Sequence, residues 1–508
     1  MGNDNDDLLD KEPVAGLSAA SSCIRLSLCL DDGKLSPPCH FFPVYTHQCF
    51  PDEFISGWRP MASAEQSSQQ VYQRWRYGSV GDTPAASIGE KHPSYKHIDD
   101  EHKQIGVNVL LSPSCDKCKI EVQTTSTSHN NEPATKKAKI VTFEEADAGA
   151  TQQLSIGDVV KKIQSSVPPI ASVTIDGSST TIVAGAKSDD TDFNYLSHPI
   201  GSVVKSYSRK IIYSRGMSEE GDFVITLAKG SDPSVASYHN TIQPLARWFI
   251  ETADDVNVSD EDGGFWSVLY LFRKHHDKSS DDGTSTFRYS LAGYITLFHF
   301  HAPFRKPNPG IIVRICQALI LPIYQRAGHG SELLLSVHEY ADRYLNDYAS
   351  SSTGMDIVEV NVEDPAPGFV ALRDSVDYKR FVSLTDGKPE PDVKYLKKYT
   401  VTSKEYFQPA PDGGLTISSL LKITKRQAEV MHEIYKLASM EKWKQGSNDN
   451  EQIQQVETYY RLMIKKSLKS HRTEELGACE GGKEEQKALL AKWFDQTHNH
   501  YRKLLGLV

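Results

Sequence analysis

The sequence predicts an α/β protein, in the broad sense that includes α+β, with a mixed central sheet, an N-terminal α/β domain and a C-terminal helical bundle. Three observations predict it. Strand-like apolar runs dominate the middle of the chain, one of them leads through a glycine-bearing turn into a leucine-rich helix, and amphipathic helical stretches follow. A chain of 508 residues also exceeds a single hydrophobic core, so two or three domains are expected.

The N-terminal part of the chain alternates strand-like and polar segments. Residues 1–20 are acidic and polar, which predicts a disordered tail. Residues 21–195 form the predicted N-terminal domain, in which "CIRLSLCL" and "IGVNVLLS" have the composition of strands. Polar stretches near 61–100 and 123–155 interrupt this domain and are predicted to be mobile insertions. The second contains "KKAK" (136–139), which is either a weak nuclear-import signal or a chance basic run.

The predicted central domain, residues 196–376, carries the mixed sheet. Its strand candidates are residues 265–274, 286–301, 310–323 and 355–364. A helix over 331–345 separates the last two strands, so the segment forms an α/β unit. Residues 241–253 carry apolar side chains at helical spacing, which predicts a further helix.

The predicted helical domain, residues 377–508, contains three amphipathic stretches. They run over 417–440, 450–471 and 484–507, and glycine- or asparagine-containing breaks separate them. Short breaks between amphipathic helices are typical of a helical bundle.

Composition disfavours several classes of protein. Mean hydropathy is -0.45 and no run of about 18 apolar residues occurs, so we predict no contact with a membrane. A net charge of -10 disfavours direct DNA binding and suits a basic partner. The acidic run at 251–264 is either a solvated loop or part of the surface that attracts such a partner. The N-terminus lacks the pattern of a signal peptide, so nucleus and cytoplasm are the expected locations.

The cysteines give little sign of a metal site or a nucleophile. Cys115 and Cys118 form the motif "CDKC", but no second ligand pair follows at zinc spacing. We therefore predict no metal, with a structural metal at this pair as the alternative. Cys316 lies within an apolar strand candidate, where an inert core thiol is favoured over a nucleophile.

The turn "QRAGHG" at residues 325–330, called the glycine turn below, has the character of an anion site. A helix N-terminus exposes backbone N–H groups and partial positive charge, and Gly328 and Gly330 allow close approach of a ligand. A P-loop requires Lys after the last glycine, where this chain has Ser331. A dinucleotide fingerprint requires a third glycine, where it has Leu333.

The glycine turn instead matches the Q/R-x-x-G-x-G/A pattern of the GNAT acetyltransferases, in which it wraps the pyrophosphate of acetyl-coenzyme A. Longer segments resemble the catalytic subunit of type B histone acetyltransferases. These segments are "FFPVYTHQCF" (41–50), "PIGSVVKSYS" (199–208), "WFIETA" (248–253), "GYITLFHF" (293–300), "ALILPIYQRAGHGSELLLSVHEY" (318–340) and "VEVNVEDPAPGFVALRD" (358–374). They occur in the family's order from about residue 20 to residue 375, and the helical C-terminal part is less specific.

The resemblance implies a GNAT fold and acetyl-coenzyme A as co-substrate. The implied coenzyme-binding residues are Ala318, Leu319, Ile320, Gln325, Arg326, Ala327, Gly328, His329, Gly330, Ser331 and Gly368. The first three would pair their backbone with the pantetheine amides. Relatives often carry a polar side chain where Gly368 stands, so only backbone could make that contact here. His329 could instead act as a catalytic acid, although a backbone-presenting role is favoured inside such a loop.

Acetyl transfer to lysine requires a group that takes a proton from the amine, because a free lysine has a pKa of about 10.4. Glu363 and Asp364 end a strand candidate, which composition alone explains as an ordinary acidic strand end. The resemblance implies that Glu363 is the general base, with Glu251 and Asp364 as assisting carboxylates. Three carboxylates around one pocket would raise one another's pKa.

Substrate recognition is also implied by the resemblance. The family's contacts with the histone H4 tail fall on Asp52, Glu53, Phe298, His299 and Phe300. Acidic and aromatic side chains suit a lysine-rich peptide. Residues 297–300 can equally form an ordinary strand of the sheet. Both interpretations hold if one face of the strand packs inside the protein and the other contacts the peptide.

The sequence thus predicts an enzyme that acetylates the N-terminal tail lysines of newly synthesised histone H4. An acetyltransferase of a non-histone amine and a catalytically silent histone-binding chaperone subunit are the alternatives. The resemblance also implies a WD-repeat histone chaperone as partner.

Overall fold

The computed structural model describes residues 24–30, 39–41, 43, 45, 49, 58–60, 103–126, 156–175, 178–180, 195–212, 218–251, 253–277, 286–305, 309–348, 354–384, 416–479 and 481–507. The chain divides into two compact units. The first is Met1–Asp260, Tyr270–Tyr294 and Gln317–Ala327, and the second is Glu261–Leu269, Ile295–Cys316 and Gly328–Val508. Within the ranges described, no helix is long and apolar enough to cross a membrane.

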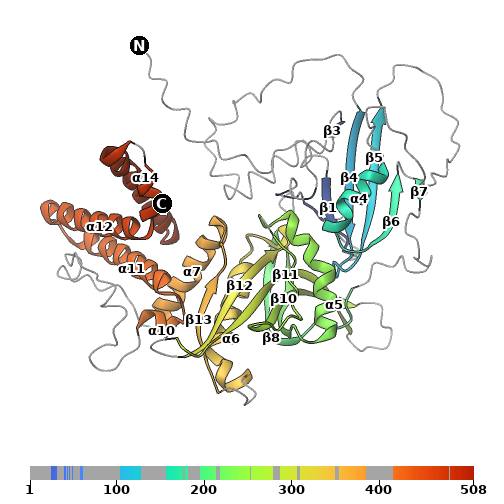
Figure 1. Cartoon of the computed structure of the whole chain (residues 1–508), viewed down its shortest axis with the longest axis horizontal. Coiled ribbons are helices and arrows are strands. Elements are labelled where there is room, and N and C mark those ends of the chain that lie inside the picture. The colour runs from blue at the N-terminus through green and yellow to red at the C-terminus, as the bar shows by residue number, and fades with distance from the viewer. Residues whose placement is uncertain are drawn as a thin grey trace, which may run out of the picture. The chain divides into compact units, whose positions relative to one another are not determined.

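The first unit contains a seven-stranded sheet in the order β2-β1-β4-β5-β6-β7, with β3 paired to β4 (Figure 1). Its strands are β1 (Ile24–Leu28), β2 (Cys39–Phe41), β3 (Trp58–Pro60), β4 (Lys103–Leu111), β5 (Cys118–Ser126), β6 (Ile170–Ile175) and β7 (Ser178–Thr180). Parallel and antiparallel pairs occur together, and α4 (Ile156–Ile163) precedes β6. β5 includes residues 123–126, which the sequence places at the start of a mobile insertion.

Buried backbone bonds join this sheet region to later parts of the same unit. Tyr45 donates its backbone N–H to the Trp248 carbonyl over 3.0 Å, and the Trp248 indole donates to the carbonyl of Ser166. Leu291 donates its N–H to Pro113 over 2.9 Å. Trp248 is fully buried, so the segment "WFIETA" starts from a fixed point in the first unit.

The second sheet has six strands in the order β13-β12-β11-β10-β9-β8. Strands β10, β11 and β12 contribute residues to both compact units. The strands are β8 (Ser202–Ile212), β9 (Ser218–Lys229), β10 (Gly264–Asp277), β11 (Thr286–Ala302), β12 (Gly310–Ile320) and β13 (Ile357–Val362). β8 and β9 are antiparallel, whereas β12 and β13 are parallel. The predicted mixed α/β fold is confirmed, and so are the four predicted strands.

The strand ends and helix types differ from the prediction in two places. β12 stops at Ile320 because Pro322, which has no N–H to donate, begins the 3-10 helix η7 (Pro322–Tyr324). The predicted helix over 241–253 is wrong. Its first residues end α5 (Pro233–Ile242), and the 3-10 helix η6 (Gln243–Trp248) follows, since a proline at position 244 interrupts α-helical bonding.

Two helices of the second unit follow the strands that carry the candidate site. α6 (His329–Arg343) begins at the glycine turn and confirms the helix predicted over 331–345. α7 (Pro367–Leu384) begins shortly after β13 and was not predicted.

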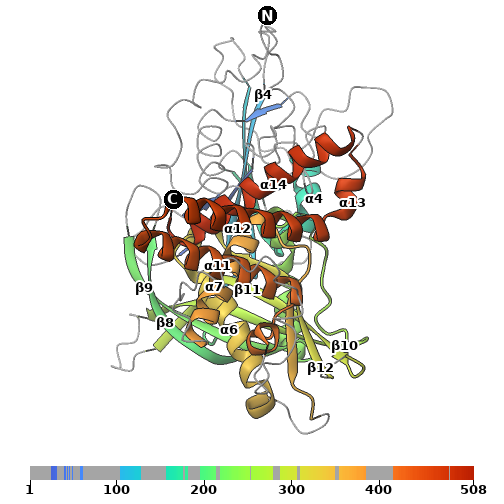
Figure 2. The same cartoon turned by 90° about the vertical axis from the view of Figure 1, so that its left-hand side faces the viewer.

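The C-terminal segment is helical, as predicted (Figure 2). Its helices are α10 (Ile417–Leu421), α11 (Lys425–Gly446), α12 (Asn450–His471), α13 (Thr473–Gly477) and α14 (Gly482–Leu504). The first predicted stretch is split, because Lys422 adopts a left-handed φ of 52° and the Thr424 side chain caps α11 by accepting from the Gln427 N–H.

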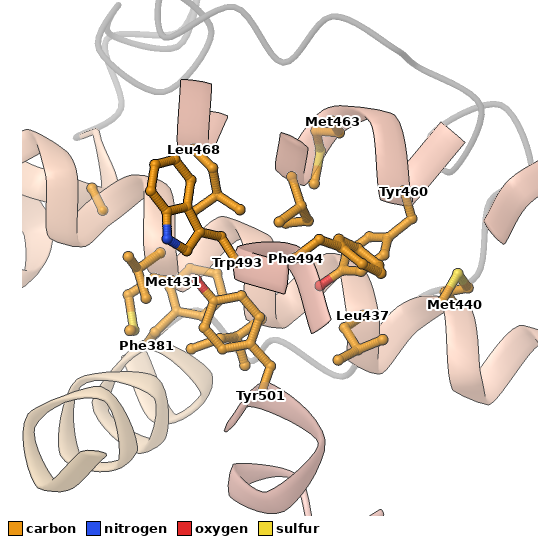
Figure 3. Close-up of a cluster of buried hydrophobic side chains, with 14 of the residues drawn as sticks. Phe381, Met431, Leu437, Met440, Tyr460, Met463, Leu468, Trp493, Phe494 and Tyr501 are labelled. Atoms are coloured by element: carbon orange, nitrogen blue, oxygen red, sulfur yellow. The ribbon is translucent and has the colours of Figure 1, made fainter. Parts of the chain in front are cut away.

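The C-terminal helices enclose a hydrophobic core (Figure 3). Met431, Ile434, Leu437, Val456 and Ile464 are at most 1% exposed. Figure 3 shows Phe381 of α7 beside side chains of the later helices. Burying one such large apolar side chain stabilises the fold by roughly 1.5–3 kcal/mol.

Glu433 of α11 is a carboxylate inside this core, with 4% of the residue exposed. One carboxylate oxygen accepts from the Ser467 hydroxyl over 2.6 Å and from Arg426 over 3.4 Å. The other accepts from the Tyr501 hydroxyl over 2.6 Å. Burial, followed by this carboxylate, raises the pKa of Tyr501 well above its ordinary value, so the phenol stays a donor.

A second buried polar cluster joins α6 and α7 to the bundle. The Gln427 amide donates to Asp374 over 2.8 Å and to Asp377 over 3.0 Å. Asp377 also lies 3.1 Å from His338 of α6, and Asp374 lies 3.0 Å from His500 of α14. These bonds fix α6, whose first residues belong to the glycine turn, against the C-terminal helices.

Candidate functional site

The glycine turn connects η7 to α6 through two left-handed residues. Arg326 has a φ of 63° and Gly328 a φ of 86°, and the helix begins at the next residue. The Gln325 side-chain amide donates to the Ile320 carbonyl over 2.8 Å and so ties the turn back to the end of β12. A left-handed φ suits Gly328 because glycine has no Cβ to clash with the backbone.

The first turn of α6 presents its backbone at the glycine turn. Gly328 is the N-cap, and within the described ranges no side chain caps this end of the helix. Glu332 makes the first helical bond, to the Gly328 carbonyl over 3.2 Å. His329 is 1% exposed, which favours the backbone-presenting interpretation of this residue over a catalytic acid. An uncapped helix N-terminus of this kind attracts anions.

The C-terminal end of β12 runs on beyond its pairing with β13. The two strands are in register from Ile311 to Ile315, and Glu363 donates its N–H to the Ile315 carbonyl over 3.0 Å. Residues 316–320 of β12 lie past that pairing, and they include the predicted pantetheine-binding segment.

Gly293 of β11 explains how closely the neighbouring strand approaches this segment. A Cβ on Gly293 would lie 2.4 Å from the Leu319 carbonyl oxygen, so a larger residue would push the backbone apart. The glycine of "GYITLFHF" therefore maintains the strand spacing beside Leu319.

Glu363 and Asp364 lie together where the chain leaves β13, as predicted. Both are exposed, and the Glu363 side chain is 52% accessible. Asp364 adopts a φ of 35°, a left-handed conformation that aspartate tolerates better than most residues. This turn ends the strand and leads to α7, whose first turn contains Gly368.

β12 presents two side chains to the Glu363 carboxylate. Nη1 of Arg314 lies 3.9 Å from Oε1 of Glu363, and the Cys316 thiol also interacts with this carboxylate. Burial raises the pKa of Cys316 to about 12, with Glu363 as the second cause. A raised pKa keeps the thiol protonated at neutral pH, which favours the interpretation of an inert thiol over a nucleophile.

The three aromatic residues predicted to bind substrate lie on two faces of β11. His299 is fully buried, stacks on Phe265 at 4.2 Å, and its Nε2 lies 2.9 Å from the Tyr340 hydroxyl. Burial lowers the pKa of His299 to about 4. His299 therefore presents no exposed surface to a peptide in this structure. Phe298 and Phe300, by contrast, are half-buried, and their ring centroids lie 4.5 Å apart.

Two further residues continue this face and were not singled out from the sequence. The Trp266 ring lies 4.8 Å from Phe298, and the Arg314 guanidinium lies 4.6 Å from the Phe300 ring centre. Trp266, Phe298, Phe300, Arg314 and Glu363 thus form a row across β10, β11, β12 and the end of β13. The period-two alternation of the strands could have identified the row, but only if strand order and register were known.

Glu251 lies in the first compact unit, exposed just after η6. The acidic loop that follows it is anchored at Asp254, whose carbonyl accepts from the buried Gln317 amide over 2.7 Å. Tyr294 donates to the same glutamine over 3.2 Å. Arg247 pairs with Asp255 over 2.6 Å. The loop after Glu251 is therefore held to the strands of its unit.

For several other predicted residues, the described part of the chain shows no contact within the candidate site. Asp52, Glu53 and "KKAK" lie outside the residues that the structure describes. Gly368 is exposed, and a Cβ placed on it would meet nothing within 4 Å, so its backbone is open to a ligand.

Cys115 and Cys118 are both fully buried. Burial raises the pKa of Cys118 to about 12, and its thiol donates to the Pro168 carbonyl. Neutral thiols are poor metal ligands. In the part of the chain that the structure describes, no three His, Cys, Asp or Glu residues gather as a metal site.

The described structure combines a mixed α/β sheet, a strand that leads into a glycine turn at a helix N-terminus, and an exposed acidic strand end. The chain is similar to curated catalytic subunits of type B histone acetyltransferase. It is 28% identical over 270 residues to one from Dictyostelium discoideum, covering 53% of this chain and 49% of the relative. It is 29% identical over 270 residues to the Rattus norvegicus protein, covering 53% of each.

The Homo sapiens protein of the same name is 28% identical over 272 residues, again with 53% of each chain covered. The chain spans about half the length of the curated relatives it matches. No family model matches the chain. The resemblance inferred from its motifs is confirmed by these relatives.

Proposed function

We propose that this protein is a histone acetyltransferase that transfers acetyl from acetyl-coenzyme A to N-terminal tail lysines of newly synthesised histone H4. The observation that best supports this proposal is the arrangement of residues where β13 and β12 end. The exposed carboxylate of Glu363 follows the last bond between β13 and β12, and β12 itself leads on to an uncapped helix N-terminus. The names of the similar proteins support the reaction class.

The coenzyme would bind along β12 and the glycine turn. The backbone of Ala318, Leu319 and Ile320 lies beyond the pairing with β13, which suits hydrogen bonds to the two pantetheine amides. The N–H groups of the first α6 turn and the helix dipole suit a diphosphate. The exposed Arg326 adds positive charge at the same turn.

Glu363 would act as general base. It removes a proton from the lysine ammonium, and the neutral nitrogen attacks the thioester carbonyl carbon. The carbon–sulfur bond then breaks, and coenzyme A leaves as a thiolate that takes up the nitrogen's second proton. Asp364, adjacent in the chain, and Glu251 are proposed to assist by attracting the cationic side chain.

The aromatic row would bind the lysine side chain. Trp266, Phe298 and Phe300 offer ring faces and edges to an aliphatic stem or a cation. His299 supports this strand from its buried face. Asp52 and Glu53 remain part of the proposal through the resemblance, and the acidic loop after Glu251 suits a basic tail.

The relatives are named catalytic subunits, which supports a complex with other proteins. A WD-repeat histone chaperone is the proposed partner, and nucleus and cytoplasm are the proposed locations.

The test is mass spectrometry of an unmodified H4 tail peptide after incubation with the purified chain and acetyl-coenzyme A. We expect acetylation of specific lysines. Acetylation of small amines but not of the peptide would favour the non-histone alternative. Peptide binding without acetylation, although the coenzyme binds, would favour a silent chaperone subunit.

A further inference from the structure

Arg314 of β12 is fixed from three strands. Its Nη1 lies 3.9 Å from Glu363, and its Nε donates to the Asn361 side chain over 3.3 Å. Its guanidinium lies 4.6 Å from the Phe300 ring centre. A guanidinium held by a ring face and an amide has few orientations left, so its position next to Glu363 is determined by the sheet.

Strand register explains why these groups meet. Arg314 and Asn361 are partners in the parallel pairing of β12 and β13. Side chains two residues apart on a strand point to the same face, so Glu363 follows Asn361 on the face that Arg314 occupies. Arg314 is therefore directed at the last carboxylate of β13 by the sheet itself.

Cys316 follows Arg314 on the same face of β12 and also interacts with Glu363. Its thiol carries no charge when protonated and lies 3.8 Å from the Arg314 carbonyl oxygen. Asp364 is the neighbour of Glu363 in the chain. Arg314 thus brings a positive charge close to Glu363 on this face.

We propose that Arg314 is a positioning residue for Glu363, which orients the carboxylate at the strand end for proton transfer from the incoming amine. This inference rests on the proposed function and adds to it how the base is held in place. Both side chains are partly exposed, so the interaction is modest and weakens with salt.

The first test separates kcat from KM with the H4 tail peptide. Arg314→Gln removes the guanidinium contact to Glu363, so we expect kcat to fall about five- to tenfold while the peptide KM changes by less than about twofold. Arg314→Lys keeps a cation but not the planar fork, and we expect it to recover part of the lost rate.

Arg305→Gln is the matched control. Arg305 forms an ion pair with Glu359 of β13 over 2.6 Å. Glu359 lies on the same face of the strand as Glu363 and precedes it in the chain. We expect its kcat to equal that of the parent protein. An equal loss of kcat in Arg305→Gln, or no loss in Arg314→Gln, would overturn the proposal.

A second measurement requires no activity. Carbon-13 NMR of glutamate-labelled full-length protein, without peptide or coenzyme, follows the carboxyl signal that disappears in Glu363→Gln. The chemical shift of this signal at neutral pH should move in Arg314→Gln, because the carboxylate changes its orientation, and stay in Arg305→Gln. If Arg314→Gln does not fold, Arg314→Met replaces it, because the apolar part of the side chain is kept. A protein without acetyl transfer would refute the proposed function, whereas an unmoved signal would refute only the role of Arg314.

Discussion

Two glutamates of the second compact unit show how differently one side chain is used in two regions. Glu433, in the helical core, is 4% exposed, and both its oxygens accept hydrogen bonds from Ser467, Arg426 and Tyr501. Glu363, at the end of β13, has a side chain that is 52% exposed and lies 3.9 Å from Arg314.

The two environments suit different roles: Glu433 stabilises the helical core, and Glu363 is accessible to a substrate. A buried carboxylate with hydrogen bonds to both oxygens has little room to accept another proton or ligand without disturbing those bonds. An exposed carboxylate with a long contact on one side keeps acceptor capacity for a substrate. The helical core thus uses its glutamate to hold three helices, and the strand end keeps its glutamate accessible for chemistry.

The largest expected effect is on activity at the strand end. Glu363→Gln removes the base but keeps size and polarity, so we expect kcat to fall by about 100-fold or more. Binding of acetyl-coenzyme A, measured by calorimetry, and the melting temperature should stay close to those of the parent. A variant that kept the parent rate across neutral pH would refute the assignment of the base.

The complementary change in the core should affect stability alone. Glu433→Gln removes the buried charge near Arg426 and one of the two oxygens that accept hydrogen bonds, so we expect a loss of about 1–3 kcal/mol in the free energy of unfolding. Urea unfolding measures it. Acetyl transfer per folded molecule should be unchanged at low temperature. If activity fell while stability stayed, the two glutamates would not have the separate roles described above.

The core also predicts a dependence of stability on pH. Burial, and then Lys436, lowers the pKa of His432 on α11 to about 3. Because the unfolded chain protonates this residue near pH 6.5, its contribution is complete above that pH and is lost as pH falls toward 3, by up to about 1.4 kcal/mol per pH unit. Urea unfolding between pH 7 and 4.5 measures the slope. His432→Asn should flatten it, and an unchanged slope would contradict the neutral buried imidazole.

The smallest expected effect concerns the glycine turn. Gly328→Ala places a Cβ at a φ of 86°, which costs about 1 kcal/mol. We expect a KM for acetyl-coenzyme A raised several-fold, with the KM for peptide unchanged. Gly354→Ala, at another left-handed glycine with a φ of 60° that lies outside the glycine turn, is the control. An equal rise in the KM for the coenzyme in both variants would mean that the effect is not specific to the glycine turn.

Much of this architecture follows from local sequence patterns. The helix predicted over 450–471 is α12 to the residue, because Asp449 caps its start by accepting from the Gln452 N–H. The strand run, the glycine turn and the helix after it were predicted in order. A capped amphipathic helix and an alternating strand are determined by neighbours in the chain, so these features can be predicted without the fold.

Other features depended on partners far apart in sequence. The pattern around residue 299 could not tell that His299 points to Tyr340, while Phe298 and Phe300 share the opposite face with Trp266. The β8–β9 hairpin and α7 were not predicted from the sequence. Residues 241–253 have the apolar spacing of an α-helix, but the proline at position 244 prevents α-helical hydrogen bonding there and a 3-10 helix forms.

By itself, the sequence determined the class of fold, the order of its elements, the glycine turn and the acidic residues that end a strand, since each is encoded in a few adjacent positions. Only the tertiary structure decided which faces these residues occupy. Strand register placed Arg314 against Glu363, and close packing of α11 with α12 and α14 enclosed Glu433. Contacts between distant segments depend on packing and register, which a local pattern does not specify.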